Sequence, residues 1–362
     1  MEQGRTASKA LVQPVHLEQG ISLTRHKPQL IKNILIYKYL MNLENISVLV
    51  TGGAGFIGSH IVEFLLSHGV KYVRILDNLS TGAFSNIKHL FDIYNNVEFI
   101  WGDITNIETC RKACKDITLV CHQAALGSVP RSINDPYTSH NVNVNGFLNM
   151  LIAIKENNIK RIVYASSSSV YGSNKNKVKI ENEIGEPLSP YAITKYIDEL
   201  YGKIFTDIYG LECIGLRYFN VFGPRQNPTG AYAAVIPKFI KMIVDNKAPT
   251  INGDGSYARD FTYIDNVVFA NYLALTTKNE ECYGKIFNVG TNNNITINEL
   301  YHHIAEILDK KELTPIYGSV RLGDVPYSNA SVEKISKYLG YKPKVSFIDG
   351  LRKTIEYFQC HR

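Results

Sequence analysis

The sequence predicts an α/β fold, a Rossmann-type doubly wound parallel sheet with a smaller C-terminal substrate-binding lobe. Three observations carry this prediction. Short apolar runs alternate with segments of helical period from Ser47 to Tyr218. A glycine-rich turn joins the first apolar run to the first helical segment, as in a β-α-β unit. Beyond Asn220 the alternation loosens, and clusters of Gly, Pro and Asn at 223–230 and 252–256 indicate a more irregular lobe.

The expected elements follow one another in chain order. The first strand covers 47–51, and the helix after it has apolar residues at Ile61, Phe64 and Leu65 and ends at Gly69. Strands that alternate with helices in this way form a parallel sheet covered on both faces. Further strands are expected at 72–77, 97–101, 117–122, 161–166 and 213–218, with helices at 137–157 and 191–209 among the segments between them.

Three parts are expected along the chain. Residues 1–45 show no clear period and read as an N-terminal extension. Residues 46–220 form the Rossmann domain, which also receives part of 262–290, and residues 221–362 form most of the second lobe. Within the extension, 30–43 can be an amphipathic basic helix, and Met41 offers an alternative start.

Composition excludes several classes of protein. The chain has 362 residues, of which 45% are hydrophobic and 20% charged, as in an ordinary water-soluble globular protein. Its net charge of +6 is partly due to the extension, so nucleic-acid binding is not favoured. The run 30–43 is too short for a membrane span and is broken by Lys32 and Lys38. Six cysteines without zinc-finger spacing predict reduced structural thiols in a cytoplasmic protein that holds no metal.

The turn after the first strand has the chemistry of a phosphate site. Gly52, Gly55 and Gly58 give G-x-x-G-x-x-G spacing, and glycine lets a backbone approach a pyrophosphate at a helix N-terminus. Asp77 ends the second expected strand. A carboxylate there accepts hydrogen bonds from ribose hydroxyls and repels a 2′-phosphate, which favours NAD over NADP. The alternative for Asp77 is a plain strand-end turn.

Polar and small residues also end the third and fourth expected strands. Asp103 ends the third strand, and Gln123 and Ala124 follow the fourth. Strand carboxyl ends face the ligand crevice of an open parallel sheet, so these residues can contact a cofactor, although ordinary loop chemistry would also explain them.

Tyr191 and Lys195 lie four residues apart and share one face of an expected helix. An ammonium beside a phenol stabilises the phenolate and lowers the pKa of the phenol. The pattern alone is at chance level in a chain with 23 tyrosines. Ser167 strengthens it, since it lies in a serine run at a strand end, where a hydroxyl can hold a substrate alcohol while the phenolate removes its proton.

Together these motifs resemble the nucleotide-sugar 4-epimerase family of the extended short-chain dehydrogenases/reductases. The resemblance runs from about Ile46 to the C-terminus, and segments 127–133, 216–224, 231–237 and 259–261 are similar to the subgroup that acts on UDP-N-acetylhexosamines and their uronic acids. It implies tightly bound NAD and a homodimer formed through helices near 137–157 and 191–209. It implies these cofactor contacts: Gly52, Gly55, Phe56, Ile57, Gly58, Asp77, Asn78, Ser80, Thr81, Gly82, Asp103, Ile104, Gln123, Ala124, Tyr191, Lys195 and Val221.

The same resemblance implies roles around a UDP-sugar. Tyr191 would be the base, Lys195 its partner, and Ser167 with Ser168 would hold the sugar 4-hydroxyl. Arginines and an asparagine would surround the diphosphate, and an aspartate would accept a uridine ribose hydroxyl. The implied substrate contacts are Ser128, Ser167, Ser168, Tyr191, Asn220, Ala234, Val235, Thr250, Asn252, Arg259, Arg321, Asp324 and Ser328.

Departures from related enzymes narrow the reaction. Ser168 and Ser169 stand where similar dehydratases have an Asp-Glu pair and similar decarboxylases a glutamate, so no carboxyl group is available to eliminate water. Ser328 stands where strict UDP-galactose epimerases have a tyrosine, and its small side chain leaves room for a 2-acetamido group. An ordinary loop serine is the alternative there.

The predicted function is therefore NAD-dependent 4-epimerisation of UDP-N-acetylglucosamine and UDP-N-acetylgalactosamine, or of the corresponding uronic acids, through a transient 4-keto sugar. The enzyme alternative is a UDP-glucose/UDP-galactose 4-epimerase. The alternative of another class is a non-catalytic regulator that binds NAD or a UDP-sugar. Such a protein would not need Ser167, Tyr191 and Lys195 together, so their presence disfavours it. Arg131 can meet a uronate carboxylate or only shape its loop, so the sequence leaves the neutral sugar and the uronate open.

Overall fold

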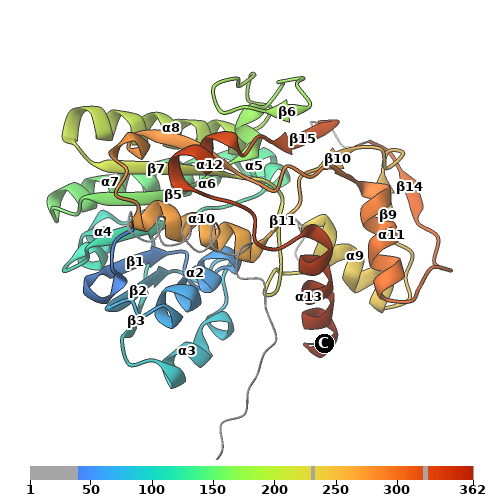
Figure 1. The fold of residues 1–362 in the computed structure, drawn as a ribbon, viewed down its shortest axis with the longest axis horizontal. Helices are drawn as coiled ribbons and strands as arrows, with labels where there is room; N and C mark the ends of the chain where they lie inside the picture. The colour runs from blue at the N-terminus through green and yellow to red at the C-terminus, as the bar shows by residue number, and fades with distance from the viewer. Residues whose placement is uncertain (1–39, 230–232, 321–324, 362) are drawn as a thin grey trace, which may run out of the picture. The chain divides into compact units, whose positions relative to one another are not determined.

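The computed structural model describes residues 40–229, 233–320 and 325–361. In this part of the chain, seven parallel strands form a central sheet in the order β12-β7-β5-β4-β1-β2-β3 (Figure 1). The predicted Rossmann-type α/β fold is thus confirmed. The strands of this sheet are β1 (Ser47–Thr51), β2 (Tyr72–Asp77), β3 (Val97–Trp101), β4 (Leu119–His122), β5 (Arg161–Ser167), β7 (Glu212–Tyr218) and β12 (Lys285–Val289).

The strand bounds agree closely with the periodicity of the sequence. Strands β1, β2 and β3 begin and end where predicted. Strand β4 begins at Leu119 rather than Ile117, because Ile117 still belongs to the turn after α4, where its N donates to Cys114 O at 3.3 Å and Asp116 has a φ of 60°. Strand β5 extends to Ser167, which therefore projects from the end of the strand itself.

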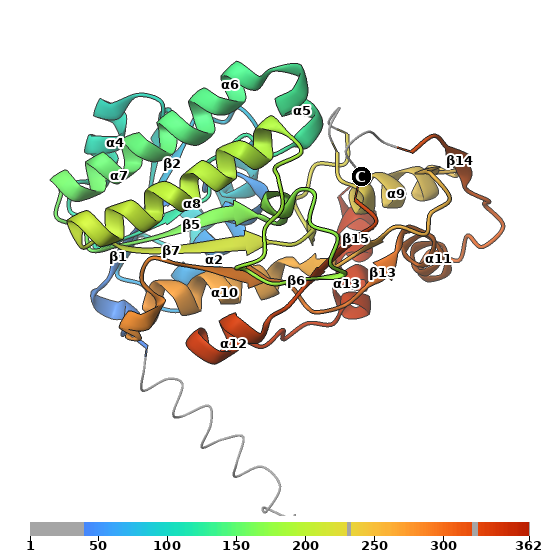
Figure 2. The ribbon, with the colours of Figure 1, turned by 90° about the horizontal axis from the view of Figure 1, so that it is seen from above.

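Helices cover both faces of the sheet (Figure 2). One face carries α4 (Ile107–Cys114), α7 (Gly146–Glu156) and α8 (Pro190–Tyr209), and the other carries α2 (Phe56–Ser67) and α10 (Ile264–Thr276). The predicted helix over 137–157 differs in detail, because a π-helical turn at Asn141–Asn145 separates α6 (Pro136–His140) from α7. Within this turn the buried Asn143 accepts a hydrogen bond from Leu126 N at 2.8 Å and donates to Thr194 Oγ1 at 3.0 Å. The turn therefore ties the loop after β4 to α8.

Short elements complete the described structure. They form one sheet in the order β13-β10-β15-β6, the two pairs β11-β8 and β14-β9, and further helices. The short strands are β6 (Val178–Lys179), β8 (Val221–Phe222), β9 (Thr250–Asn252), β10 (Ala258–Arg259), β11 (Thr262–Tyr263), β13 (Ile295–Thr296), β14 (Ile316–Gly318) and β15 (Tyr327–Ala330). The remaining helices are α3 (Lys88–Ile93), α5 (Val129–Asn134), α9 (Val235–Val244), α11 (Ile297–Ile307), α12 (Glu333–Leu339) and α13 (Phe347–Cys360), with single helical turns at Leu43–Asn45, Phe84–Asn86, Ser168–Tyr171 and Glu280–Cys282.

The centre of the sheet creates a ligand crevice. Strand β1 is buried on both faces, since Val48, Leu49 and Val50 are fully inaccessible. The chain passes from β1 to β2 and β3 on one side, whereas β4 lies on the other side of β1. Loops leaving β1 and β4 therefore diverge, and ligands bind at such a switch point. Thr51 Oγ1 and His122 Nδ1, 2.9 Å apart, join the ends of these two strands.

The first described residues already pair with the folded body. Leu40 forms a β-bridge with Thr277, and Met41 N donates to Thr276 O at 2.7 Å. The rest of the predicted extension, residues 1–39 with most of the helix considered at 30–43, lies outside the described residues. Among the helices of the described ranges, none has the length and apolar character needed to cross a membrane.

Candidate active site

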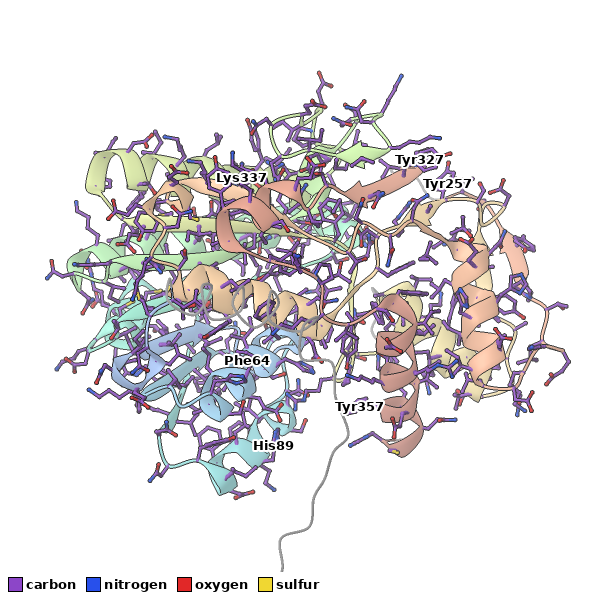
Figure 3. All side chains as sticks on the ribbon, in the orientation of Figure 1. Phe64, His89, Tyr257, Tyr327, Lys337 and Tyr357 are labelled. Carbon is purple, nitrogen blue, oxygen red and sulfur yellow. The ribbon has the colours of Figure 1, made fainter. Side chains whose placement is uncertain are left out.

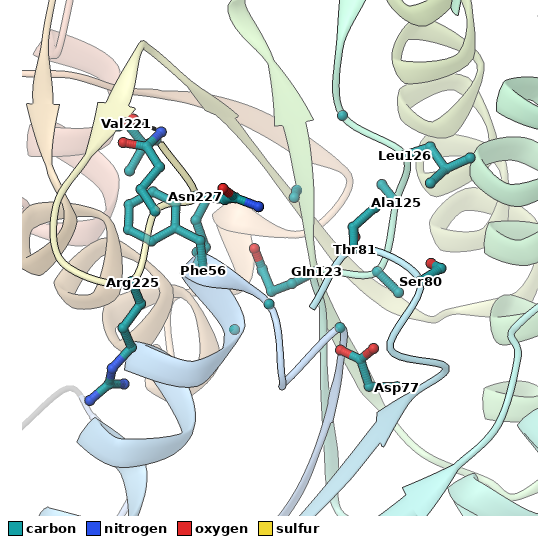
Figure 4. Close-up of a pocket in the computed structure, with 18 of the residues that line it drawn as sticks. Phe56, Asp77, Ser80, Thr81, Gln123, Ala125, Leu126, Val221, Arg225 and Asn227 are labelled. Carbon is teal, nitrogen blue, oxygen red and sulfur yellow. Dashed lines mark hydrogen bonds between the residues drawn. The ribbon is translucent and has the colours of Figure 1, made fainter. Parts of the chain in front are cut away.

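A cavity of about 840 Å³ opens at the carboxyl ends of the central strands. Its walls come from the segments that follow β1, β2, β3, β4, β5 and β7, together with the first turns of α8 and the end of α13. Figure 4 shows Asp77 at the tip of β2, Gln123 after β4 and Phe56 at the start of α2 around it. The cavity thus gathers the predicted motifs in one place.

The glycine turn leaves space for a diphosphate. Gly52 has a φ of 66°, and a Cβ at this position would lie 2.7 Å from Ala124 N. A Cβ on Gly58 would overlap the carbonyl oxygen of Gly52. The turn therefore packs tightly against β4 and α2 without side chains, and the N-terminus of α2 follows at Phe56. Backbone N–H groups at the start of α2, together with the helix dipole, fit the pyrophosphate of NAD.

Two carboxylates stand at the strand ends on the β2 and β3 side of the cavity. Asp77 is 7% exposed and accepts hydrogen bonds from Ala54 N at 3.0 Å and Leu79 N at 2.8 Å. Burial raises the pKa of Asp77 despite these two bonds. Asp103 accepts from Asn78 Nδ2 at 2.8 Å and from Thr105. These hydrogen bonds outweigh burial and lower the pKa of Asp103. Each carboxylate retains acceptor capacity for hydroxyl or amino groups of a nucleoside.

Ser167, Tyr191 and Lys195 line the same cavity. Tyr191 lies in the first turn of α8, where its backbone N donates to Ser132 Oγ of α5 at 3.0 Å. Lys195 lies one turn further on and is 2% exposed. The side chain of Ser167 accepts from Ser169 Oγ at 2.9 Å. The helix and the strand end thus present a phenol, an ammonium and a hydroxyl to one space.

A buried carboxylate contacts the lysine. Asp198 Oδ2 lies 3.0 Å from Lys195 Nζ, and both side chains are almost fully inaccessible. Burial raises the pKa of Asp198 to about 7, although Lys195 pulls it down. Burial alone would lower the pKa of Lys195, but the attraction of Asp198 and of Tyr191 outweighs it, so the pKa is raised and the lysine stays charged. Asp198 was not predicted, although a charged residue three positions after Lys195, on the same helix face, was a readable signal.

Other unpredicted lining residues come from distant parts of the chain. Arg225 follows β8, donates to Ser59 Oγ at 3.4 Å and pairs with Glu63. Tyr357, labelled in Figure 3, lines the cavity from α13 together with Phe358 and His361. No local pattern in the sequence indicates that a helix so far along the chain lines this cavity.

A second cavity of about 720 Å³ adjoins the first, and Asn220, Val221 and Ala234 line both. Four other predicted substrate residues line this second cavity: Val235, Thr250, Asn252 and Arg259. A substrate in the second cavity can therefore reach the first one at the segment after β7.

Three predicted contacts lie beside the described cavity walls rather than in them. Ser128 caps α5, where its Oγ accepts from Arg131 N at 3.2 Å. Gly82 packs against the glycine turn, and a Cβ on it would lie 2.8 Å from Ala54 C. Ser328 is 8% exposed in β15, directly opposite Arg259 of β10. Arg321 and Asp324 lie outside the described residues.

The described lining holds all the predicted cofactor contacts except Gly82. The other sixteen line the first cavity: Gly52, Gly55, Phe56, Ile57, Gly58, Asp77, Asn78, Ser80, Thr81, Asp103, Ile104, Gln123, Ala124, Tyr191, Lys195 and Val221.

Carboxylates are absent from the part of the described lining around Tyr191. Among the described residues around the first cavity, the acidic ones are Asp77 and Asp103, which stand at the ends of β2 and β3. Ser167 and Ser168 occupy the end of β5 beside Tyr191. This arrangement offers a phenol and hydroxyl groups, but no carboxylic acid that could protonate a departing hydroxyl.

Several known proteins are similar to this chain over most of its length. The model of the NAD dependent epimerase/dehydratase family matches residues 48–290. A Methanocaldococcus jannaschii protein named putative UDP-glucose 4-epimerase is 39% identical, covering 86% of this chain and 98% of its own. The UDP-glucuronate 4-epimerase of Thermodesulfobacterium geofontis is 34% identical, covering 85% and 95%. A solved UDP-N-acetylglucosamine 4-epimerase from Methanobrevibacter ruminantium, in complex with UDP-N-acetylmuramic acid, is 40% identical with a TM-score of 0.82, covering 88% and 100%.

Proposed function

The chain belongs to the NAD-dependent epimerase/dehydratase family, and from this premise we propose that it is a 4-epimerase of UDP-N-acetylhexosamines or their uronic acids. Its relatives are NAD-dependent nucleotide-sugar 4-epimerases, and it is an enzyme of this kind that uses NAD. The proposed reaction interconverts UDP-N-acetylglucosamine and UDP-N-acetylgalactosamine, or the corresponding uronic acids, through a transient 4-keto sugar. The observation that carries it is the meeting of the glycine turn, Ser167, Tyr191 and Lys195 in one cavity.

Bound NAD supplies a reversible acceptor for the hydrogen on C4 of the sugar. In the proposal, the phenolate of Tyr191 removes the proton of the 4-hydroxyl and later returns it. The ammonium of Lys195 stabilises that phenolate and holds the nicotinamide ribose, since a lysine has three N–H donors. The hydroxyl of Ser167 orients the sugar alcohol toward Tyr191, and Asp77 accepts the adenosine ribose hydroxyls.

The absence of an acid beside Ser167 supports epimerisation over dehydration. Elimination of water needs a group that protonates the leaving hydroxyl, and the described lining near Tyr191 has no carboxyl group. Oxidation and reduction of one carbon needs only the base and the cofactor. We therefore propose that the 4-keto sugar turns within the site and is reduced from its other face.

The second cavity is the proposed place of the UDP group. Arg259 lines it and offers a guanidinium for the diphosphate, while Asn220 stands at its junction with the first cavity. We propose that Arg321 and Asp324 complete this part of the site. As predicted from the sequence, residues 46–220 with part of 262–290 would then bind NAD, and most of 221–362 would bind the UDP-sugar.

Two features support an acetamido sugar. The Methanobrevibacter ruminantium relative is named for UDP-N-acetylglucosamine and its structure contains UDP-N-acetylmuramic acid. The small Ser328 stands in register with Arg259, which lines the second cavity, and lies beside that wall rather than in it. The second candidate, UDP-glucose/UDP-galactose epimerisation, is favoured by the name of the Methanocaldococcus jannaschii relative, and a plain uronate by that of the Thermodesulfobacterium geofontis one.

A homodimer is proposed because α8 exposes an apolar stripe. Ile193, Leu200, Ile204 and Ile208 are 47–65% exposed and recur at helical spacing. Helix α6 packs against α8 and carries a further exposed aromatic side chain, Tyr137. A face of this kind can pair with its own copy about a two-fold axis. Sedimentation should give a dimer for the wild type and a monomer for Ile204→Glu; a monomeric wild type would contradict the proposal.

The test of function compares three substrates. NMR should follow turnover of UDP-N-acetylglucosamine, its uronic acid and UDP-glucose by the purified protein, with Tyr191→Phe as the inactive variant and Tyr94→Phe as the matched control. We expect an acetamido sugar to react fastest, Tyr191→Phe to lose at least 1,000-fold or so in rate, and Tyr94→Phe to keep the wild-type rate. A higher rate with UDP-glucose would establish the second candidate. Equal behaviour of wild type and Tyr191→Phe with every sugar would overturn the enzyme assignment.

A further inference from the structure

Lys195 and Asp198 form an ion pair inside the protein. Nζ and Oδ2 lie 3.0 Å apart, and the two side chains are 2% and 1% exposed. The second oxygen of Asp198, Oδ1, is buried without a hydrogen-bond partner among the described residues. Carboxylates in proteins are normally stabilised by several hydrogen bonds, so this one is weakly supported in its charged form.

The nearest charges come from α8 and from the strands beneath it. Glu199 follows Asp198 but is engaged by Arg217 of β7, through bonds of 2.8 Å and 2.7 Å, and by Ser166 of β5 at 2.5 Å. Tyr164 of β5 also faces Asp198, and burial, aided by Glu199, raises its pKa so far that it stays neutral. Lys195 is therefore the cation that Asp198 meets directly.

The other elements packed on α8 contribute little charge at this place. Tyr137 and His140 of α6 and Lys155 of α7 are exposed, so water and salt screen them. Tyr171, after β5, donates to Asn288 Oδ1 at 2.7 Å. His122 of β4 also lies close enough to interact with the charge of Lys195; burial, aided by that charge, lowers its pKa to about 3, so its ring is neutral. The other titratable groups near α8 include Arg131 of α5, which is half-buried next to Ser128, and the buried thiol of Cys213 in β7.

We propose that Asp198 is a positioning residue that holds the ammonium of Lys195 and that its charge controls how strongly this ammonium stabilises the Tyr191 phenolate. The inference rests on the roles of Tyr191 and Lys195 given under the proposed function. One N–H of the ammonium points to Asp198, and two remain for the cofactor ribose and the phenolate. The pair thus fixes the lysine side chain before the cofactor binds.

The charge state of Asp198 changes near neutral pH, since burial raises its pKa to about 7. Below that pH the carboxyl is neutral and the ammonium acts on Tyr191 undiminished. Above it the carboxylate opposes phenolate formation, because a like charge nearby disfavours ionisation. Removal of the carboxylate should therefore make Tyr191 ionise at lower pH, by about one pH unit, the lower end of the range for neighbouring charges.

The experiment is a tyrosinate titration that needs no substrate. The near-ultraviolet absorbance of tyrosinate is recorded against pH for the NAD-loaded protein, and the same titration of the Tyr191→Phe form is subtracted, which isolates Tyr191. The test variants are Asp198→Asn, of equal shape, and Asp198→Ser, which keeps a small polar group if the amide is not tolerated. Asp207→Asn is the matched control, because it removes an exposed carboxylate paired with Lys203 on the same helix.

We expect both Asp198 variants to shift the Tyr191 signal about one pH unit lower, which is tenfold more phenolate at the acid end, and the control to leave it in place. The acid limb of the kcat profile should move in the same direction with whichever UDP-sugar is turned over. Titrations that coincide with the wild type, or shift upward, would overturn the inference. If the titration shifts and no UDP-sugar reacts, the proposed function fails while the role of Asp198 stands.

Discussion

The close approach of Gly58 to Gly52 gives a quantitative prediction for the cofactor site. A Cβ on Gly58 would overlap the Gly52 carbonyl oxygen and lie 2.8 Å from both Gly52 C and Gly53 Cα. Carbon atoms in contact prefer about 3.5 Å or more, so Gly58→Ala must push the turn and α2 apart by at least ~0.7 Å. A displacement of about 1 Å costs roughly 100-fold in rate where it misplaces reacting groups, and we expect a loss of the same order in NAD affinity, or about 2.7 kcal/mol.

The assay measures the NAD retained per chain after purification and the Kd for NAD by calorimetry on the stripped protein. Gly69→Ala is the control, because Gly69 follows the same helix, has a φ of 74° and has nothing within 4 Å of its Cβ position. It should cost about 1 kcal/mol of stability through backbone strain and leave the Kd unchanged. Wild-type NAD affinity in Gly58→Ala would refute the role given to the glycine turn.

Three further predictions concern stability and specificity. Glu199→Gln leaves the buried Arg217 without its counter-charge, so urea unfolding should show a loss of about 3–5 kcal/mol, against less than about 1 kcal/mol for the exposed Asp207→Asn. Burial, aided by Lys195, lowers the pKa of His122 from 6.5 to about 3, so the folded state binds this proton less readily than the unfolded state. The free energy of unfolding should therefore fall as pH drops from about 6.5 toward 3, by up to about 1.4 kcal/mol per pH unit. His122→Asn should flatten that slope. Ser328→Tyr should abolish turnover of acetamido sugars and spare UDP-glucose; equal losses with both would count against steric selection.

Local patterns in the sequence were sufficient to predict the fold and most of the residues that line the first cavity. Strand ends such as Thr51 and Asp77 are visible because buried parallel strands are continuous apolar runs that stop at polar residues. The glycine turn and the spacing of Tyr191 and Lys195 act over a few residues, so their chemistry can be read without knowledge of the packing.

Features that depend on packing across the chain could not be predicted. The spacing of Asp198 and Lys195 was a readable signal for their contact, but the burial of Asp198 was not, because a charged side chain normally favours solvent. Within the π-helical turn, Asn143 contacts both the loop after β4 and α8, and neither contact is visible in the local sequence. Tyr357 reaches the cavity because of how α13 packs, and no local spacing records that contact.

The most direct test of the central claim is an NMR analysis of the reaction in D₂O with UDP-N-acetylglucosamine. If the carbon that loses hydrogen regains the same hydrogen inside the closed site, UDP-N-acetylgalactosamine should form with protium retained at C4 and with no loss of water. Tyr191→Phe should form no product. Deuterium at C4, or a product that has lost water, would contradict a reversible oxidation at a single carbon.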